Sequence, residues 1–401
     1  MAWLNGYGLA KRKECVTNME FRTMENLGVK TSLLGFGCMR FPTNADGSIN
    51  EEETLAMIDK AYQAGVNYFD TAYPYHDGKS EVVTGKALSR YPRDSYYLAT
   101  KLPMWAVHSI EDAKRIFQEQ LDRLQKDYVD FYLLHALNRE RWNQVKELDV
   151  LGYCEQLRKE DKVRYIGFSF HDDYAAFEEI LTSYSWDFCQ IQFNYMDKDT
   201  QATQKGVEQA EKLGIPMIIM EPVKGGSLAS LPEDVAKLFY AARPEESIAS
   251  WAMRYVGSFD NVKVILSGMS AMEQVEDNIK TFADFAPLDE SEQKVIAQVA
   301  ETLHNRVQNG CTACRYCMPC PAGVNIPGCF HVWNNYHIYE NKQEAARRWK
   351  NEIADAQKAS NCIKCGKCEQ VCPQKIAIRE DLARLQKELD EIAMSECVQW
   401  N

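Results

Sequence analysis

Four polar residues in the first third of the chain have the types and positions needed for proton transfer to a carbonyl oxygen. Asp70, Lys101 and His135 each stand at the end of a short apolar run that indicates a buried strand, and Tyr75 lies five residues after Asp70. A tyrosine is a weak acid with a reference pKa of about 10, and a neighbouring ammonium favours its ionised form. Such a set can hold a substrate oxygen and deliver a proton to it.

Each of these residues also has an ordinary structural role. A strand-end aspartate commonly caps a turn, a lone lysine is usually solvated, and a lone histidine is often a hydrogen-bonded structural residue. Their placement on three successive strands favours a shared pocket, because neighbouring strands lie about 4.8 Å apart. We expect Asp70 to hold Lys101, His135 to orient a carbonyl oxygen, and Tyr75 to donate the proton.

A repeating strand–helix pattern must position these residues. After a hairpin over 20–32, the predicted strands are Leu33–Gly37, Asn67–Asp70, Tyr96–Thr100, Val129–Leu134, Arg164–Phe168, Phe188–Ile191, Met217–Met220 and Lys263–Leu266. The predicted helices are Glu51–Ala64, Ser80–Leu88, Ile110–Leu124, Asn143–Arg158, Tyr174–Leu181, Thr203–Leu213, Glu245–Tyr255 and Glu273–Thr281. Eight such units over roughly 250 residues predict an α/β fold, a (β/α)₈ TIM barrel, which carries its chemistry at the carboxyl ends of its strands. An open doubly wound sheet is the alternative, but the first strand is not followed by its Gly-rich turn.

Length and composition indicate a second domain and exclude some functions. The chain has 401 residues, of which 45% are hydrophobic and 26% charged, so it can bury a large core. Its net charge of −12 argues against nucleic-acid binding, and it has no apolar run long enough for a membrane span. Residues 1–18 lack the apolar core of a secretory signal, so we expect a cytoplasmic protein and treat this stretch as an extension that is either non-native or disordered.

Cysteines mark the second domain. Of 14 in the chain, ten lie between Cys311 and Cys397. Eight of them form two runs, Cys311-x2-Cys314-x2-Cys317-x2-Cys320-Pro321 and Cys362-x2-Cys365-x2-Cys368-x3-Cys372-Pro373. The second run has the spacing of bacterial ferredoxins, in which the cysteine before proline binds the other cluster. We therefore expect two [4Fe–4S] clusters, one held by Cys311, Cys314, Cys317 and Cys372, the other by Cys362, Cys365, Cys368 and Cys320. Two Cys₄ zinc sites are the alternative.

The domain organisation follows from these patterns. We place the barrel at 19–290 and a mainly α-helical dicluster ferredoxin domain at 291–401, with helical segments expected at Ser291–Val307, within Val332–Ala359 and at Arg379–Ala393. Exposed clusters of this kind suggest an anaerobic or microaerobic microbe.

The barrel region resembles the aldo-keto reductase superfamily, in particular its iron–sulfur-containing members. The resemblance rests on Leu34–Gly37, Gly65–Ala72, Ser80-Glu81, Leu98–Lys101, Tyr128–His135 and Ile166–Ser169, in this order and at these spacings. It implies a (β/α)₈ barrel, a tetrad of Asp70, Tyr75, Lys101 and His135, and NAD(P)-dependent reduction of a carbonyl compound or the reverse oxidation of an alcohol.

The resemblance also implies a cofactor site. Ser169 and Gln190 match ligands of the nicotinamide carboxamide, Gly37 and Met39 lie near the cofactor, Ser267 and Gly268 end the last strand, and Gln274 and Asn278 stand where the adenine end binds. The chain departs from the pattern at Phe170, at Met220, and at the 2′-phosphate site, where Gly268, Met269 and Gln274 replace basic residues. The choice between NAD and NADP therefore stays undecided.

Two functions follow from the combination of domains. The first is an oxidoreductase that reduces a small-molecule aldehyde or ketone with Tyr75 as proton donor, linked to two clusters. The second is an electron-transfer or partner-docking iron–sulfur protein whose barrel binds a flavin or no longer uses free nicotinamide. The second is weighed because nicotinamide passes two electrons together while each cluster passes one. Either the clusters are structural or regulatory, or the barrel holds a flavin, or an external redox partner acts through the clusters.

Overall fold

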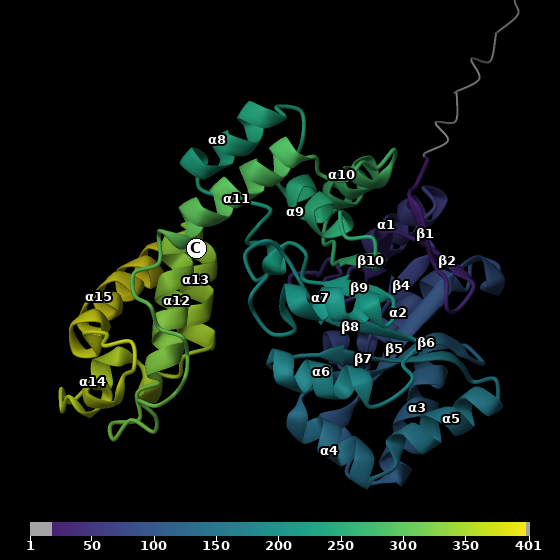
Figure 1. Cartoon of the computed structure of the whole chain (residues 1–401), viewed down its shortest axis with the longest axis horizontal. Coiled ribbons are helices and arrows are strands. Elements are labelled where there is room, and N and C mark those ends of the chain that lie inside the picture. Colours follow the sequence, from purple (N-terminus) through teal and green to yellow (C-terminus); the bar gives the residue numbers. More distant parts are fainter. Residues whose placement is uncertain (1–17, 398–401) are drawn as a thin grey trace, which may run out of the picture. The chain divides into compact units, whose positions relative to one another are not determined.

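The computed structural model describes residues 18–397, and its main feature is a closed barrel of eight parallel strands (Figure 1). The strands are β3 Leu34–Gly37, β4 Tyr68–Asp70, β5 Tyr97–Pro103, β6 Val129–Leu137, β7 Val163–Phe170, β8 Phe188–Gln192, β9 Met217–Met220 and β10 Val262–Ser267. Each pairs with its neighbours in chain order, and β10 closes the ring against β3. The predicted (β/α)₈ fold is confirmed.

A hairpin covers the amino-terminal end of the barrel. Its strands are β1 Phe21–Met24 and β2 Val29–Ser32. Met24 and Val29 are buried against residues at the barrel's interior, among them Tyr68 and Phe188, which begin β4 and β8. Apolar side chains fill this end of the barrel. We therefore expect the functional site at the opposite end, where the strands finish.

Helices alternate with the strands in the order that the sequence predicts. They are α1 Glu51–Gln63, α2 Lys79–Leu88, α3 Ile110–Leu124, α4 Arg139–Glu147, α5 Val150–Lys159, α6 Tyr174–Thr182, α7 Thr203–Lys212, α8 Glu233–Ala242, α9 Ile248–Gly257 and α10 Met272–Phe282. Asn50 and Ser109 cap α1 and α3 by accepting backbone N–H bonds from Glu53 and Asp112.

Two helical details differ from the prediction. The single helix expected over Asn143–Arg158 is two helices, because Asp149 adopts a left-handed conformation with φ of 51° and interrupts the hydrogen-bond ladder. Helix α8 was not predicted at all. It lies in the long segment after β9 that also contains α9. Its buried residues include Val235 and Phe239, and the helix belongs to a second compact unit of the chain rather than to the unit that contains the barrel.

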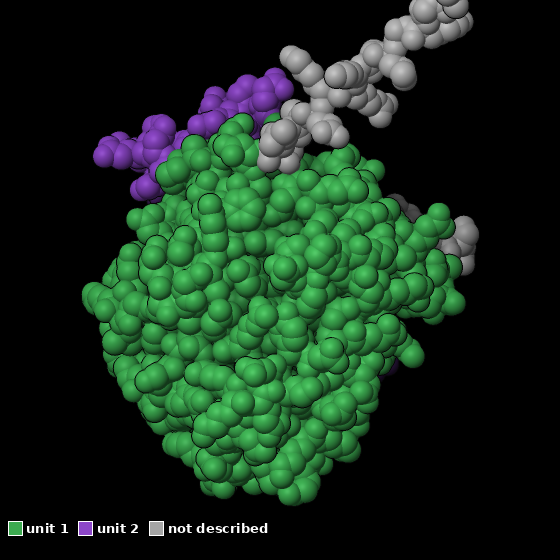
Figure 2. All heavy atoms as spheres, turned by 90° about the vertical axis from the view of Figure 1, so that its right-hand side faces the viewer, with its two compact units in different colours: residues 1–222, 253–287 green, residues 223–252, 288–401 purple. Residues whose placement is uncertain are grey.

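The chain divides into two compact units (Figure 2). The first contains the barrel and extends to Pro222, then continues over Met253–Pro287; the second contains Val223–Ala252 and everything from Leu288 onward. The predicted boundaries at 19–290 and 291–401 stay a prediction. The predicted extension at 1–18 lies outside the described residues, apart from Asn18.

The second unit is helical, as predicted for the carboxyl-terminal region. Besides α8 it contains α11 Glu290–His304, α12 Ile326–Tyr339, α13 Lys342–Asn351, α14 Lys367–Val371 and α15 Ile378–Cys397. Trp333, Trp349 and Leu385, from α12, α13 and α15, are fully buried in one core, and six of the cysteines in the two runs pack against it. No helix within residues 18–397 is long and apolar enough to cross a membrane.

Candidate functional site

The structure brings the four residues of the predicted tetrad together at the carboxyl end of the barrel. The ammonium of Lys101 is fully buried and donates to the Asp70 carboxylate at 2.5 Å and to the Thr71 carbonyl at 2.8 Å. Its distance to the Tyr75 hydroxyl is 3.4 Å. The His135 ring lies edge-on to the Tyr75 ring, with centroids 6.0 Å apart. An acid, a cation, a phenol and an imidazole therefore lie together at the carboxyl end of the barrel.

Burial and charge decide the protonation of this group. Burial lowers the pKa of Lys101, but Asp70 and then Tyr75 outweigh it, so the pKa is raised and the lysine keeps its proton. The pKa of His135 falls well below its ordinary value, first because of burial and then because of Lys101, so its ring is neutral near pH 7. Burial raises the pKa of Tyr75 by more than Lys101 lowers it. Lys101 lowers the pKa of Tyr75, as expected, but burial has the larger effect and the pKa is raised overall. The phenol is therefore protonated and able to donate its proton.

Tyr75 sits on a strained turn that the sequence did not reveal. The two residues after it, His76 and Asp77, have φ values of 50° and 52°, a conformation that costs L-residues about 1–2 kcal/mol each. The backbone N–H of Phe41 donates to Nε2 of His76 at 3.2 Å, and the His76 ring stacks on Phe41 with centroids 5.7 Å apart. His76 thus ties the loop that carries Tyr75 to the segment following β3.

A buried polar network binds the backbone of Lys101. Gln120 on α3 donates to the Lys101 carbonyl at 3.0 Å and to the Glu81 carboxylate at 3.0 Å. Glu81 is fully buried and also accepts from Thr100 at 2.7 Å and from Arg123 at 3.2 Å. This network fixes β5 at Thr100 and Lys101, and only Glu81 carried a sequence signal, through the Ser80-Glu81 motif.

The predicted carboxamide ligands lie on adjacent strands. One of them has a hydrogen-bond donor available and the other has an unpaired acceptor. Ser169 on β7 is directly opposite Gln190 on β8. The Ser169 hydroxyl accepts from the Ala136 N–H at 2.7 Å and keeps its own proton for donation. The Oε1 atom of Gln190 is buried with no hydrogen-bond partner in the described chain. One donor and one orphaned acceptor side by side fit a carboxamide, which offers both groups in return.

The other predicted cofactor residues gather where β3 and β10 end. A Cβ atom at Gly37 would lie 3.2 Å from the Ser267 carbonyl, and Asn278 donates to the Ser267 hydroxyl at 2.9 Å. Gln274 accepts the Ser270 N–H at 2.8 Å, and the side chain of Met39 is 51% exposed.

One cation near this end of the barrel was missed. The side chain of Arg40 packs so closely on Gly268 that a Cβ atom there would lie 2.8 Å from its Cγ. Arg40 lies three residues after β3, and no local pattern predicts that it approaches Gly268, a position where the family's basic residues are replaced.

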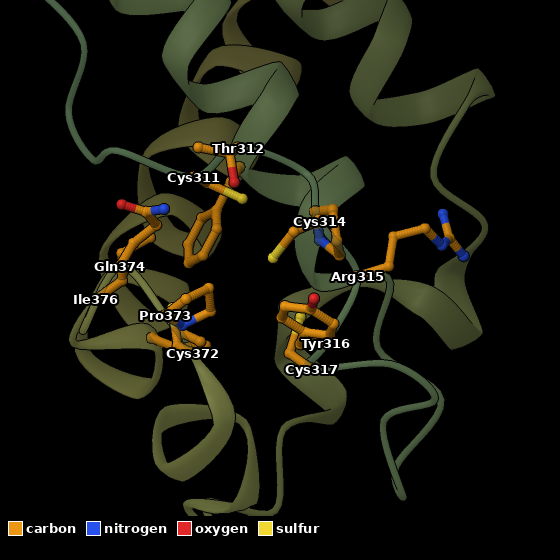
Figure 3. A pocket seen from close by; sticks show the side chains of 13 residues that line it. Cys311, Thr312, Cys314, Arg315, Tyr316, Cys317, Cys372, Pro373, Gln374 and Ile376 are labelled. Carbon is orange, nitrogen blue, oxygen red and sulfur yellow. The ribbon is translucent and has the colours of Figure 1, made fainter. Parts of the chain in front are cut away.

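Four cysteines of the two runs surround one cavity (Figure 3). They are Cys311, Cys314 and Cys317 of the first run and Cys372 of the second, with Phe330 and Ile378 among the apolar lining. The same four thiols had been grouped from the sequence. Burial, followed by the neighbouring thiols, raises the pKa of Cys317, and binding to iron would require these thiols to lose their protons.

The two cysteine loops repeat one backbone pattern. Ala313 and Arg315 flank Cys314 with φ of 53° and 63°, and Lys364 and Gly366 flank Cys365 with φ of 56° and 74°. Equal turns at equal positions indicate two equivalent ligand loops. The grouping of Cys362, Cys365 and Cys368 with Cys320 stays a prediction.

The cysteines suit a cluster better than a single ion. A zinc ion binds four sulfurs at about 2.3 Å each, so they must converge on one point. Among residues 18–397, no three His, Cys, Asp or Glu side chains converge closely enough to bind one metal ion. Cys311, Cys314, Cys317 and Cys372 instead stand around a cavity, as ligands of a larger group do.

Comparison with protein families gives two matches that together span most of the chain. The model described as "Aldo/keto reductase family" matches residues 33–301. The model described as "4Fe-4S dicluster domain" matches residues 310–377, which include both cysteine runs.

Individual proteins resemble the barrel region over nearly their whole length. L-galactose dehydrogenase of Arabidopsis thaliana is 25% identical over 72% of this chain and 95% of that protein. NADH-specific methylglyoxal reductase of Escherichia coli is 23% identical over 70% of this chain and 96% of its own. Among solved structures, the holo form of an aldo-keto reductase from Bacillus halodurans covers 70% of this chain and 96% of its own, with 25% identity and a TM-score of 0.59.

Proposed function

The chain belongs to the aldo/keto reductase family and carries a 4Fe-4S dicluster domain, and from this we propose that it reduces an aldehyde or ketone, or runs the reverse reaction, with Tyr75 as proton donor. The observation that carries the proposal is the buried Lys101 ammonium, bound to Asp70 and 3.4 Å from the Tyr75 hydroxyl, with His135 beside it. The family acts on small-molecule carbonyl compounds with a nicotinamide cofactor.

The residues divide the work of protonation. Neutral His135 donates a hydrogen bond to the substrate oxygen and orients it without adding a charge that would compete with Lys101. Tyr75 is protonated in the resting site and passes its proton to the oxygen as negative charge develops there. Lys101 stabilises the phenolate left behind, and Asp70 keeps the lysine in place. In the reverse direction the same phenolate accepts the proton of an alcohol.

The proposed cofactor supplies the hydride when bound. Ser169 and Gln190 would hold its carboxamide, since they offer one donor and one unpaired acceptor on neighbouring strands. Gly37, Ser267 and Gly268 would lie along it, and Arg40, which packs on Gly268, would offer a cation to a phosphate group. The choice between NADH and NADPH is open to direct measurement.

We further propose two [4Fe–4S] clusters in the second unit, in a cytoplasmic protein of an anaerobic or microaerobic microbe. Cys311, Cys314, Cys317 and Cys372 would hold one cluster and Cys362, Cys365, Cys368 and Cys320 the other. Each cluster accepts one electron at a time, whereas hydride carries two. Electron exchange between the units therefore requires a flavin in the barrel or an external redox partner.

A feature of the second cysteine run favours the partner. Lys364, Lys367 and Lys375 are exposed, and none of the ion pairs among the described residues includes them, while Ile363 and Val371 expose 65% and 51% of their surface beside them. Residues 310–377 contain nine Lys or Arg and five Asp or Glu, against a net charge of −12 for the whole chain. This basic, apolar surface suits an acidic one-electron carrier protein.

The catalytic proposal is tested by Tyr75→Phe, with Tyr73→Phe as the matched control, because the Tyr73 hydroxyl is bound to Glu119 at 2.6 Å. Oxidation of NADH and of NADPH is followed with methylglyoxal and 4-nitrobenzaldehyde as probes. Tyr75→Phe should lower kcat by about 10²–10⁴-fold with iron content unchanged, and Tyr73→Phe should retain activity. An undiminished rate in Tyr75→Phe rejects the tetrad.

The electron-transfer alternative is tested by the absorbance spectrum of anaerobic protein before and after addition of NADH or NADPH. A flavin band would show that the protein binds the flavin that such exchange requires, and bleaching of the clusters by either nucleotide would show the exchange itself. If neither is seen, reduction by an acidic ferredoxin should be slowed by salt and by Lys364→Glu with Lys367→Glu; salt-independent reduction would contradict docking at the lysines.

A further inference from the structure

An arginine that the catalytic proposal does not use lies at the rim of the active site. Trp105, in the 3₁₀ turn Met104–Ala106 after β5, packs on His135 with ring centroids 5.0 Å apart. The guanidinium of Arg141, in the first turn of α4, lies 5.3 Å from the Trp105 ring centre. His135 in turn contacts Tyr75. Tyr75, His135, Trp105 and Arg141 are thus linked by successive ring contacts that begin at the proton donor.

The charge of Arg141 has no carboxylate partner in the part of the chain that the structure describes. One of its N–H groups donates to the Ala136 carbonyl at 2.6 Å, and a guanidinium has five N–H groups in all. Arg139, two residues earlier on the same helix, shows the contrasting case, because it pairs with Glu179 at 2.6 Å on an exposed surface. Arg141 is half-buried and pairs with no acid among the ion pairs of residues 18–397.

Arg141 brings a positive charge to the region of His135 and His171, where the Glu221 carboxylate also acts on His171. Its guanidinium is close enough to add to the lowering of the pKa of His135, after burial, Lys101 and His171. The carboxylate at the centre of the site, Asp70, is already bound to Lys101. A substrate that entered with a negative group would meet a cation without displacing an internal salt bridge.

We propose that the substrate is an oxo acid, an aldehyde or ketone that carries a carboxylate, and that Arg141 binds this carboxylate while His135 and Tyr75 hold the carbonyl oxygen. A single guanidinium matches a singly charged carboxylate in charge and in its planar, two-pronged geometry. Trp105 holds the guanidinium by a cation–π contact and supplies an apolar wall between the two ends of the substrate. The inference rests on the proposed carbonyl reduction and adds a substrate class to it.

Turnover of matched substrate pairs tests the inference. The probes are 4-formylbenzoate and its methyl ester, and succinic semialdehyde and its methyl ester. The wild type should prefer each acid over its ester in kcat/KM. Arg141→Gln should lower the acid-to-ester ratio about tenfold or more, Arg141→Lys should restore part of it, and the control Arg139→Gln should leave it unchanged. A wild type without preference, or an equal loss for acid and ester in Arg141→Gln, overturns the inference.

A binding measurement separates this inference from the proposed catalysis. Calorimetric titration with benzoate and with benzamide, in the presence of NADH or NADPH, requires no turnover. The inactive Tyr75→Phe protein should still bind benzoate more tightly than benzamide, and Arg141→Gln should lose that difference. If no aldehyde is reduced but this difference is found, the proposed reaction fails while the anion site stands. If wild-type protein does not distinguish benzoate from benzamide, the anion site is rejected whatever its activity.

Discussion

Replacing Lys101 by methionine should destabilise the barrel far more than the loss of one surface charge would. Lys101 is fully buried and Asp70 is 3% exposed, with 2.5 Å between the ammonium and the carboxylate. The other carboxylate oxygen, Oδ2 of Asp70, is already buried without a hydrogen-bond partner in the described chain. Lys101→Met would therefore leave both oxygens of a buried carboxylate unpaired, and we expect a loss of about 3–5 kcal/mol in the free energy of unfolding.

The loss should depend on pH in a defined direction. Burial already raises the pKa of Asp70 in the native protein, and Lys101 opposes that rise. Without Lys101 the pKa of Asp70 rises further above its unfolded value of about 3.9. A group whose pKa is higher in the folded state favours folding when it is protonated. The variant should therefore regain stability as the pH falls toward the unfolded pKa, by at most about 1.4 kcal/mol per pH unit, and lose it as the pH rises through the folded pKa.

Urea unfolding followed by far-UV circular dichroism measures both effects, and cluster absorbance reports separately on the second unit. The matched control is Asp70→Asn with Lys101→Met, which removes the charge together with its partner and should recover most of the lost stability. Both proteins should be catalytically inactive, so activity does not distinguish them. If Lys101→Met costs less than about 1 kcal/mol, or the double variant is no more stable than the single one, the buried ion pair does not behave as argued.

Three further predictions concern other parts of the chain. Gln190→Leu should weaken binding of NADH or NADPH about tenfold in a fluorescence titration, because it removes the unpaired acceptor, while the thermal midpoint falls little. Gly85→Ala should cost about 1–3 kcal/mol in urea, because a methyl group there would meet the Leu124 carbonyl of α3, whereas Gly310, with open space around it, should accept alanine within about 0.5 kcal/mol. Cys372→Ser should remove one cluster, seen as a loss of about half the iron, with the other cluster's signal kept in electron paramagnetic resonance; loss of both would contradict independent sites.

The sequence alone determined the barrel and the identity of its central chemical groups. Strand-like runs end at Asp70, at Lys101 and at His135, and parallel strands in a barrel all present their carboxyl ends at one edge. Local pattern therefore sufficed to predict that these side chains meet. The cysteine runs were equally informative, since the ligand spacing of a cluster is itself a local property of the chain.

The sequence did not determine how the surrounding residues serve that centre. Asp149 divides a predicted helix in two, and His76 ties the turn that carries Tyr75 to Phe41 in the segment after the neighbouring strand β3. Nothing in the local pattern distinguishes such residues from ordinary loop positions, because their roles depend on contacts with segments far away in the chain.

Three placements were decided only by the tertiary structure, all for one physical reason. Gln120 on α3 donates to the Lys101 carbonyl, Arg40 in the loop after β3 packs on Gly268, and Arg141 packs on Trp105 without an acidic partner in the described chain. Strand and helix periodicity fix which residues face inward, but the direction of a long side chain and the charge of its neighbour depend on packing between elements. The tetrad could be inferred from spacing, whereas the cation that selects the proposed substrate class became visible only when β5, β6 and α4 were brought together.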